Sequence, residues 1–223
     1  MKNKTLAYSP YGDRGSSIFP FGEVFKESFN PVQKGSLEGA DALLLWGGTD
    51  INPVFYKQDW HLKTERTGHD KETSLRDMVE WHLMKEAKRL DIPIIGVCRG
   101  AQFICVFAGG SLIQDVKGHY SAHGIVTYEG LSMHASANHH QMMNPKEGTY
   151  ELLAWAETPG TDHQIEYSKP ATGPLRDKNI DPEVLWFPDI KGLAIQPHPE
   201  WMPGTSKFVQ WVNEQIERLC FKE

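Results

Sequence analysis

Short apolar runs alternate with longer stretches of helical periodicity in the first half of the chain. Three of the runs predict buried strands, over residues 4–9, 41–46 and 92–97. Helical periodicity predicts an amphipathic helix over 74–90 and an apolar helix over about 101–107, which ends at a glycine pair. On the amphipathic helix the expected buried positions are Leu75, Met78, Val79, Leu83, Ala87 and Leu90. Because strands and helices alternate, a parallel sheet covered on both faces is expected.

The pattern is weaker elsewhere in the chain. Near the N-terminus, phenylalanines at irregular spacing predict a short helix within 18–29, and a second short strand is expected over 30–33. Loops are expected over 56–71 and 168–182, and Thr205 is expected to cap a final helix. The second half is expected to be richer in strand, over 111–116, 150–156, 164–167, 184–187 and 192–195.

Composition and charge narrow the class of protein. A chain of 223 residues with 39% hydrophobic and 23% charged residues fits one globular domain, residues 1–223. The net charge is −6 and there is no basic tract, which argues against a nucleic-acid partner. No apolar stretch is long enough for a signal peptide or a membrane span, and three cysteines make no disulfide framework. A cytoplasmic protein that does not bind membranes is therefore expected.

A sharp turn with a cysteine at its tip is predicted over residues 96–100, which read Gly-Val-Cys-Arg-Gly. Small residues two positions before and after a nucleophile, between a strand and a helix, are typical of a nucleophile elbow. Cys98 would then lie at a helix N-terminus, where unpaired N–H groups favour the nucleophilic thiolate. The alternative is a buried structural cysteine, which we assign to Cys105 and Cys220 because neither has this setting.

A cysteine nucleophile needs a base, and His198 and Glu200 fit that need. They follow the apolar run over 192–195, so they too should lie at an edge of the sheet. His198 would take the proton of Cys98 and pass it to the leaving amine, while Glu200 would orient the imidazole. A His-Pro-Glu tripeptide alone fits a polar loop equally well, and it is the elbow that favours the catalytic interpretation.

Together these motifs resemble the class I glutamine amidotransferase family. The resemblance is carried by residues 96–102 and 198–200. Further motifs resemble the γ-glutamyl hydrolase branch, peptidase family C26, which includes γ-glutamyl-γ-aminobutyrate hydrolases. These motifs are Gly-Gly-Thr-Asp-Ile-Asn-Pro over 47–53, Arg76-Asp77, Asn-His-His-Gln over 138–141 and Gln-Pro-His-Pro-Glu-Trp over 196–201.

The resemblance implies both a fold and a set of site residues. The fold is a flavodoxin-like three-layer α/β sandwich with a mostly parallel central sheet, and no cofactor is implied. The implied catalytic triad is Cys98, His198 and Glu200. The implied oxyanion hole consists of the backbone N–H groups of Gly48 and Arg99. The residues that would bind the γ-glutamyl group are Gly47, Gln102, Asn138 and His139.

Two related activities follow from the resemblance. The first is hydrolysis of γ-glutamyl amide bonds through a covalent γ-glutamyl thioester at Cys98, with release of glutamate and an amine. The second is a glutaminase subunit that delivers ammonia from glutamine to a separate synthetase or ligase. In both, the substrate is a small γ-glutamyl compound or glutamine. The resemblance also leaves open whether the chain forms a homodimer.

A third hypothesis, a metal-binding or non-catalytic protein, comes from the His-rich segment 117–144. His119 and His123 are four residues apart, so on a helix they could bind one metal ion. Gly118 and Gly124 argue against a helix there, and no cysteine accompanies the histidines. We therefore expect no metal, and we expect solvated loop histidines with one or two of them in the pocket.

Overall fold

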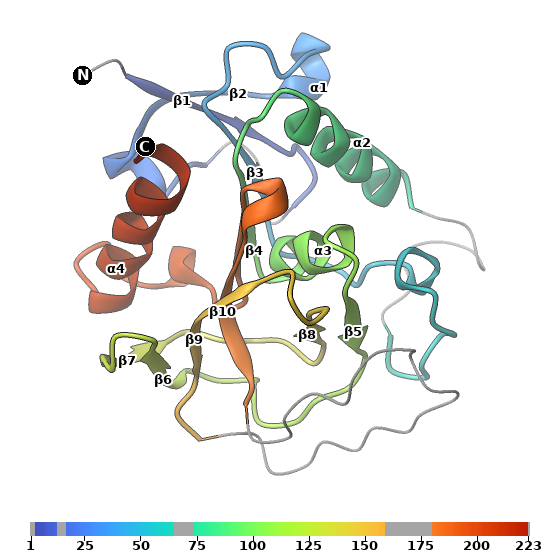
Figure 1. Cartoon of the computed structure of the whole chain (residues 1–223), viewed down its shortest axis with the longest axis vertical. Coiled ribbons are helices and arrows are strands. Elements are labelled where there is room, and N and C mark those ends of the chain that lie inside the picture. The colour runs from blue at the N-terminus through green and yellow to red at the C-terminus, as the bar shows by residue number, and fades with distance from the viewer. Residues whose placement is uncertain (1–2, 13–16, 65–73, 159–179, 223) are drawn as a thin grey trace.

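The computed structural model describes residues 3–12, 17–64, 74–158 and 180–222. Its main sheet consists of β1 (Lys4–Tyr8), β2 (Phe25–Phe29), β3 (Ala42–Leu45), β4 (Ile94–Val97), β6 (His123–Thr127), β7 (Ser132–Ala135), β9 (Glu151–Ala156), β10 (Pro182–Phe187) and β11 (Gly192–Ile195). The nine strands lie in the order β2-β1-β3-β4-β11-β10-β9-β6-β7. The α-helices are α1 (Pro31–Lys34), α2 (Leu75–Arg89), α3 (Arg99–Phe107) and α4 (Lys207–Ile216) (Figure 1).

The main sheet has a parallel half and an antiparallel half. From β2 to β11 every neighbouring pair is parallel, as predicted from the alternation of strands and helices. From β11 through β10, β9, β6 and β7 every pair is antiparallel. A separate antiparallel pair is formed by β5 (Ser111–Ile113) and β8 (Met142–Asn144).

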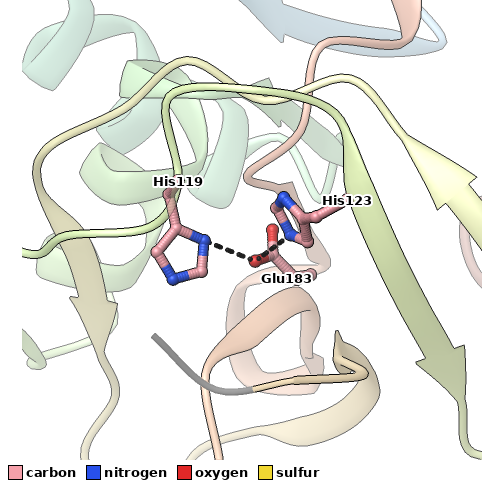
Figure 2. Close-up of side chains that lie close together, drawn as sticks. All are labelled: His119, His123 and Glu183. Atoms are coloured by element: carbon pink, nitrogen blue, oxygen red, sulfur yellow. Dashed lines mark hydrogen bonds and ion pairs between the residues drawn. The ribbon is translucent and has the colours of Figure 1, made fainter. Parts of the chain in front are cut away.

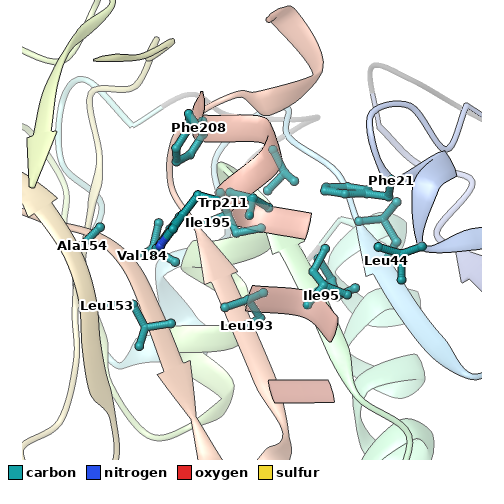
Figure 3. Close-up of a cluster of buried hydrophobic side chains, with 14 of the residues drawn as sticks. Phe21, Leu44, Ile95, Leu153, Ala154, Val184, Leu193, Ile195, Phe208 and Trp211 are labelled. Carbon is teal, nitrogen blue, oxygen red and sulfur yellow. The ribbon is translucent and has the colours of Figure 1, made fainter. Parts of the chain in front are cut away.

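Helices cover both faces of the sheet, which gives three layers: α4 lies on one side and α2 and α3 lie on the other (Figure 1). On the first face Leu44, Ile95 and Leu193 pack in one buried cluster with Phe208 and Trp211 of α4 (Figure 3). Neighbouring strand positions point to the opposite face, because side chains alternate along a strand, and pack against α2 and α3. Among the described residues, no helix is long and apolar enough to cross a membrane.

Two predictions near the N-terminus are wrong. The expected helix within 18–29 is limited to one 3₁₀ turn, Phe21–Glu23, and the rest of that segment forms the edge strand β2. The expected strand over 30–33 is instead helix α1. Asn30 caps α1 because its side-chain oxygen accepts hydrogen bonds from two backbone N–H groups of the first turn, and Pro31 occupies the first helical position.

The second half of the chain is rich in strand, as expected, and β9, β10 and β11 match predicted runs. The hairpin of β6 and β7 within the His-rich segment was not predicted. The expected strand over 164–167 and most of the expected loop over 168–182 lie outside the described residues. The expected cap of α4 is wrong by one position, because Ser206 accepts the hydrogen bond from the Val209 N–H at 3.3 Å.

Helix α2 buries the predicted face in its later turns, where Leu83 and Ala87 are in the core and Val79 and Leu90 pack against it, but not in its first turns. Leu75 and Met78 are 61% and 52% exposed, whereas Leu83 is buried as expected. Asp77 and Glu80 are turned inward instead and are almost fully buried. The first turns of α2 therefore bring two carboxylates beneath the sheet edge rather than apolar side chains.

Candidate active site

Cys98 lies at the tip of the turn between β4 and α3, as predicted. Its backbone angles are φ 50° and ψ −107°, a conformation that residues other than glycine rarely adopt. The strained backbone is held on both sides, because the Cys98 N–H donates to the Ile195 carbonyl at 2.8 Å and its carbonyl accepts from Gln102 N–H at 3.0 Å. The side chain is 7% exposed.

The two glycines of this elbow are required by close packing. A Cβ at Gly96 would overlap the backbone of Gly100. A Cβ at Gly100 would overlap the carbonyl group of Leu45 in β3. The turn can therefore form only if both positions lack a side chain, which is the physical basis of the spacing seen in the sequence.

Gly47, directly after β3, faces both Cys98 and His198. A Cβ at Gly47 would lie 3.1 Å from Cε1 of His198 and 3.5 Å from Cβ of Cys98. The predicted nucleophile, the predicted base and this glycine therefore meet at one edge of the sheet, where the parallel strands end.

Gly48 has a positive φ of 138°, and the guanidinium of Arg76 occupies the space where a Cβ would project. Arg76 donates hydrogen bonds to the carbonyl oxygens of Trp46 and Gly47 at 2.7 and 2.9 Å. Its Nε is 3.1 Å from a carboxylate oxygen of Glu80. The glycine loop beside Cys98 is thus fixed by an arginine of α2.

His198 and Glu200 form a buried pair, with 2.7 Å between Nδ1 and Oε1. Burial alone would lower the pKa of His198, but hydrogen bonding with Cys98 and with Glu200 raises it to about 10. The imidazole is therefore protonated at neutral pH. One ring face is covered by the half-exposed indole of Trp201, whose ring centroid is 3.7 Å away at an interplanar angle of 2°. Sequence analysis did not predict this stacking.

A cluster of buried charges lies beneath the elbow. The guanidinium of Arg99, the residue after Cys98, is 1% exposed and forms ion pairs with Asp77 and Glu80. It also lies 5.1 Å from the ring centroid of Phe103. We call Arg99, Asp77 and Glu80 the elbow cluster. Sequence analysis assigned only the backbone of Arg99, and the signal it missed was a pair of carboxylates three positions apart on α2.

Gln102 is buried and holds two neighbouring segments together. Its Nε2 donates to the backbone carbonyl of Gln141 at 2.9 Å and to Oε1 of Gln196 at 3.3 Å. The Gln196 N–H in turn donates to the Glu183 carbonyl at 2.8 Å. Gln102 therefore connects the helix after Cys98 with the His-rich segment and with the strand that leads to His198.

The last two predicted binding residues, Asn138 and His139, differ in their exposure to solvent. Asn138 is exposed, whereas His139 is 5% exposed. The Nδ1 of His139 lies 2.9 Å from the Gln141 carbonyl, and its ring stacks on His119 at 4.7 Å. Burial lowers the pKa of His139 to about 4, so the ring is neutral at physiological pH.

The expectation of solvated loop histidines holds for His134, which is exposed, but not for His119, which is buried. His119 is 1% exposed, and its two ring nitrogens lie 3.1 Å from Asp181 and 3.3 Å from Glu183. We call His119, His123, Asp181 and Glu183 the histidine cluster; all but His123 are buried. The segment forms no helix here, as Gly118 and Gly124 led us to expect, and His123 begins strand β6.

The chain is similar to known proteins of one family. Residues 28–162 match the family model described as Peptidase C26. Protein NtpR of Enterococcus hirae is 30% identical over 169 residues, which cover 74% of this chain and 68% of NtpR. A protein of Schizosaccharomyces pombe, described as a candidate glutamine amidotransferase, is 31% identical over 113 residues, which cover 44% of this chain and only 43% of that protein.

Among solved structures, a glutamine amidotransferase from Thermotoga maritima aligns with a TM-score of 0.62. The alignment covers 99% of both chains at 12% sequence identity. At this identity the likeness concerns the fold. It agrees with the sheet order and the three layers described above, which are those of a flavodoxin-like α/β fold.

Proposed function

Because the chain belongs to the peptidase C26 family, which makes it a hydrolase of class I glutamine amidotransferase type, we propose that it cleaves γ-glutamyl amide bonds. The products are glutamate and an amine. The observation that carries the proposal is that Cys98, His198 and Glu200 lie together at one edge of the sheet, next to Gly47.

In the proposed reaction the Cys98 thiolate attacks the γ-carbonyl carbon, and the protonated His198 gives its proton to the nitrogen of the leaving amine. The C–N bond breaks and a γ-glutamyl thioester remains on Cys98. Neutral His198 then takes a proton from water as the water oxygen attacks the thioester. Glutamate leaves, the thiolate and the imidazolium are restored, and Glu200 keeps the ring oriented throughout.

We assign the oxyanion hole to the backbone N–H groups of Gly48 and Arg99. Arg99 is the first residue of α3, and N–H groups of a first helical turn have no partner within the helix. Arg76 and the elbow cluster fix the two loops that carry these donors. Donors held in place before the reaction stabilise the developing negative charge without further reorganisation.

We assign the γ-glutamyl group to a pocket that includes Gly47, Gln102, Asn138 and His139. Gln102 acts indirectly in this assignment, because its amide holds the backbone at Gln141. His139 is neutral and buried, and with its Nδ1–H donated to the Gln141 carbonyl its Nε2 can accept a hydrogen bond without adding charge. The charged α-amino and α-carboxylate groups of the substrate need polar partners of this kind when they are buried.

The test is a glutamate-release assay over γ-glutamyl amines, γ-glutamyl peptides and glutamine. We expect release that Cys98→Ala lowers on the order of a thousandfold or more, with a comparable loss for His198→Ala and a smaller one for Glu200→Ala. Cys220→Ala is the matched control, because Cys220 lies outside the elbow, and it should keep the rate of the parent. Release that survives in Cys98→Ala would refute the assignment of the nucleophile.

The rate on glutamine distinguishes this activity from the related one. A hydrolase of γ-glutamyl amines should prefer those amines to glutamine. Strong preference for glutamine, rising when a synthetase is added, would instead indicate an ammonia-delivering subunit. If no substrate gives a product that depends on Cys98, the γ-glutamyl proposal is wrong even though the family assignment stands.

A further inference from the structure

The histidine cluster lies at the start of β10. Figure 2 shows the rings of His119 and His123 converging on the carboxylate of Glu183. One nitrogen of each ring and one carboxylate oxygen all lie within 4.8 Å of one another. His119 and Glu183 are almost fully buried, and the side chain of His123 is 18% exposed.

Hydrogen bonds around the cluster decide which nitrogen of each ring is protonated. The Nε2 of His119 lies 3.1 Å from Asp181 Oδ2, and the Nδ1 of His123 lies 3.2 Å from the Ser121 carbonyl oxygen. An ionised carboxylate and a carbonyl oxygen can only accept, so each of these two nitrogens carries a proton.

The other nitrogen of each ring faces one and the same oxygen of Glu183. His119 Nδ1 lies 3.3 Å from Glu183 Oε1, and His123 Nε2 lies 3.0 Å from that oxygen. Within the described part of the chain, the second oxygen of Glu183 is buried and has no hydrogen-bond partner. Two ring nitrogens and a carboxylate can converge in this way only with protons on the rings or with a cation between them.

We propose that His119 Nδ1, His123 Nε2 and the Glu183 carboxylate bind one divalent transition-metal cation, with Zn²⁺ the best match to the ligand set. Zinc binds imidazole nitrogen and carboxylate oxygen at about 2.0–2.2 Å in tetrahedral geometry. Neighbouring ligand atoms around such an ion lie roughly 3.3 Å apart. The two distances to Glu183 Oε1, 3.3 and 3.0 Å, are close to that spacing.

The groups behind the ligands support the same assignment. Histidines that bind a metal usually donate their other N–H to a carboxylate or a backbone carbonyl, which fixes the ring and its tautomer. Both arrangements are present here, through Asp181 for His119 and through the Ser121 carbonyl for His123. Three protein ligands leave a fourth position on the ion for water or another small ligand.

Such an ion would tie together segments that are distant in the sequence. It would link the loop before β6 to the first residues of β10. The backbone carbonyl of Glu183 accepts from the Gln196 N–H, two residues before His198. The metal would therefore stabilise the edge of the sheet from which the catalytic histidine projects, without contacting Cys98.

The test uses the full chain carrying Cys98→Ala, so that the thiolate and His198 cannot themselves bind zinc. The protein is treated with a chelator, dialysed and titrated with Zn²⁺ in a calorimeter. We expect one site per chain. We expect His123→Ala to weaken its affinity at least about tenfold and Asp181→Asn to weaken it by about 10- to 100-fold. His134→Ala is the matched control, because this exposed histidine of β7 lies outside the cluster and should leave the affinity unchanged.

Substitution with Co²⁺ supplies a readout that does not depend on a variant. The visible spectrum of the Cys98→Ala chain should show nitrogen and oxygen ligands and no sulfur-to-metal charge-transfer band. Absence of zinc binding in this chain, a sulfur band, or equal losses in His123→Ala and His134→Ala would each overturn the proposal. If His123→Ala does not fold, His123→Gln and the Co²⁺ spectrum decide the question.

Discussion

The elbow cluster and the histidine cluster compensate their buried carboxylates with different cationic side chains. Each contains two buried carboxylates, and each lies close to a segment that positions a proposed catalytic side chain. In the elbow cluster one guanidinium pairs with both carboxylates. In the histidine cluster two imidazoles face the carboxylates, and each directs a nitrogen to the same oxygen of Glu183.

The difference follows from the donors that each side chain carries. A guanidinium has five N–H groups and stays charged at every pH at which proteins fold, so it completes a carboxylate pair without help. A neutral imidazole has one N–H, and once that is used its other nitrogen is an acceptor. The elbow cluster therefore has its positive charge in the chain itself, whereas the histidine cluster needs added protons or a cation.

The largest expected effect comes from breaking the elbow cluster. Arg99→Met keeps an unbranched side chain but leaves Asp77 and Glu80 buried without their cation, so we expect a loss of about 3–5 kcal/mol in the free energy of unfolding. Denaturant titration measures this. The control is Arg89→Met, an exposed cation at the end of α2. A loss below about 1 kcal/mol, the usual size for a surface ion pair, would show that the cluster adds little.

A smaller loss in the free energy of unfolding is expected when the histidine cluster is changed. Glu183→Gln keeps the shape of the side chain but removes its charge, and the loss should be about 1–3 kcal/mol without added metal. Added Zn²⁺ should raise the melting temperature of the parent chain and leave that of Glu183→Gln unchanged. Glu151→Gln, at an exposed position of β9, serves as the control. An equal response of parent and Glu183→Gln to zinc would remove the contrast between the two clusters.

The most subtle expected change concerns a third buried imidazole, His198, which faces a thiol rather than a second carboxylate. Its pKa is raised to about 10, so its stabilising contribution is complete below its ordinary value of about 6.5 and is lost as the pH rises toward 10. Cys98→Ala removes a partner that favours the imidazolium. NMR titration of the ring should therefore find a lower pKa in this variant, and an unchanged pKa would mean that Glu200 alone holds the proton.

The parts of the site that the sequence predicted depend on neighbours along the chain. The elbow follows from glycines two positions on either side of Cys98, whose close packing is a local requirement. His198 and Glu200 are likewise separated by one residue, and the structure pairs them directly. The error over 30–33 was avoidable, because Asn30 followed by Pro31 is a recognisable start of a helix.

The parts that were missed depend on distant residues. The guanidinium of Arg99 pairs with carboxylates 22 and 19 positions earlier, on a helix for which we expected only apolar positions to be buried. His123 meets Glu183 across 60 positions, through a pairing of β6, β9 and β10 that no short pattern specifies. Polar residues that are buried by tertiary contacts carry no periodic signal in the sequence.

The backbone angles of Cys98 also affect which substitutions the position tolerates. A positive φ is costly for any residue with a Cβ and nearly free for glycine. Of two variants that both lack the thiol, Cys98→Gly should thus be more stable than Cys98→Ala by about 1 kcal/mol, the reverse of the usual order inside regular structure. A screen that selects variants only for heat resistance would then favour glycine at position 98, where the proposed reaction needs the cysteine side chain.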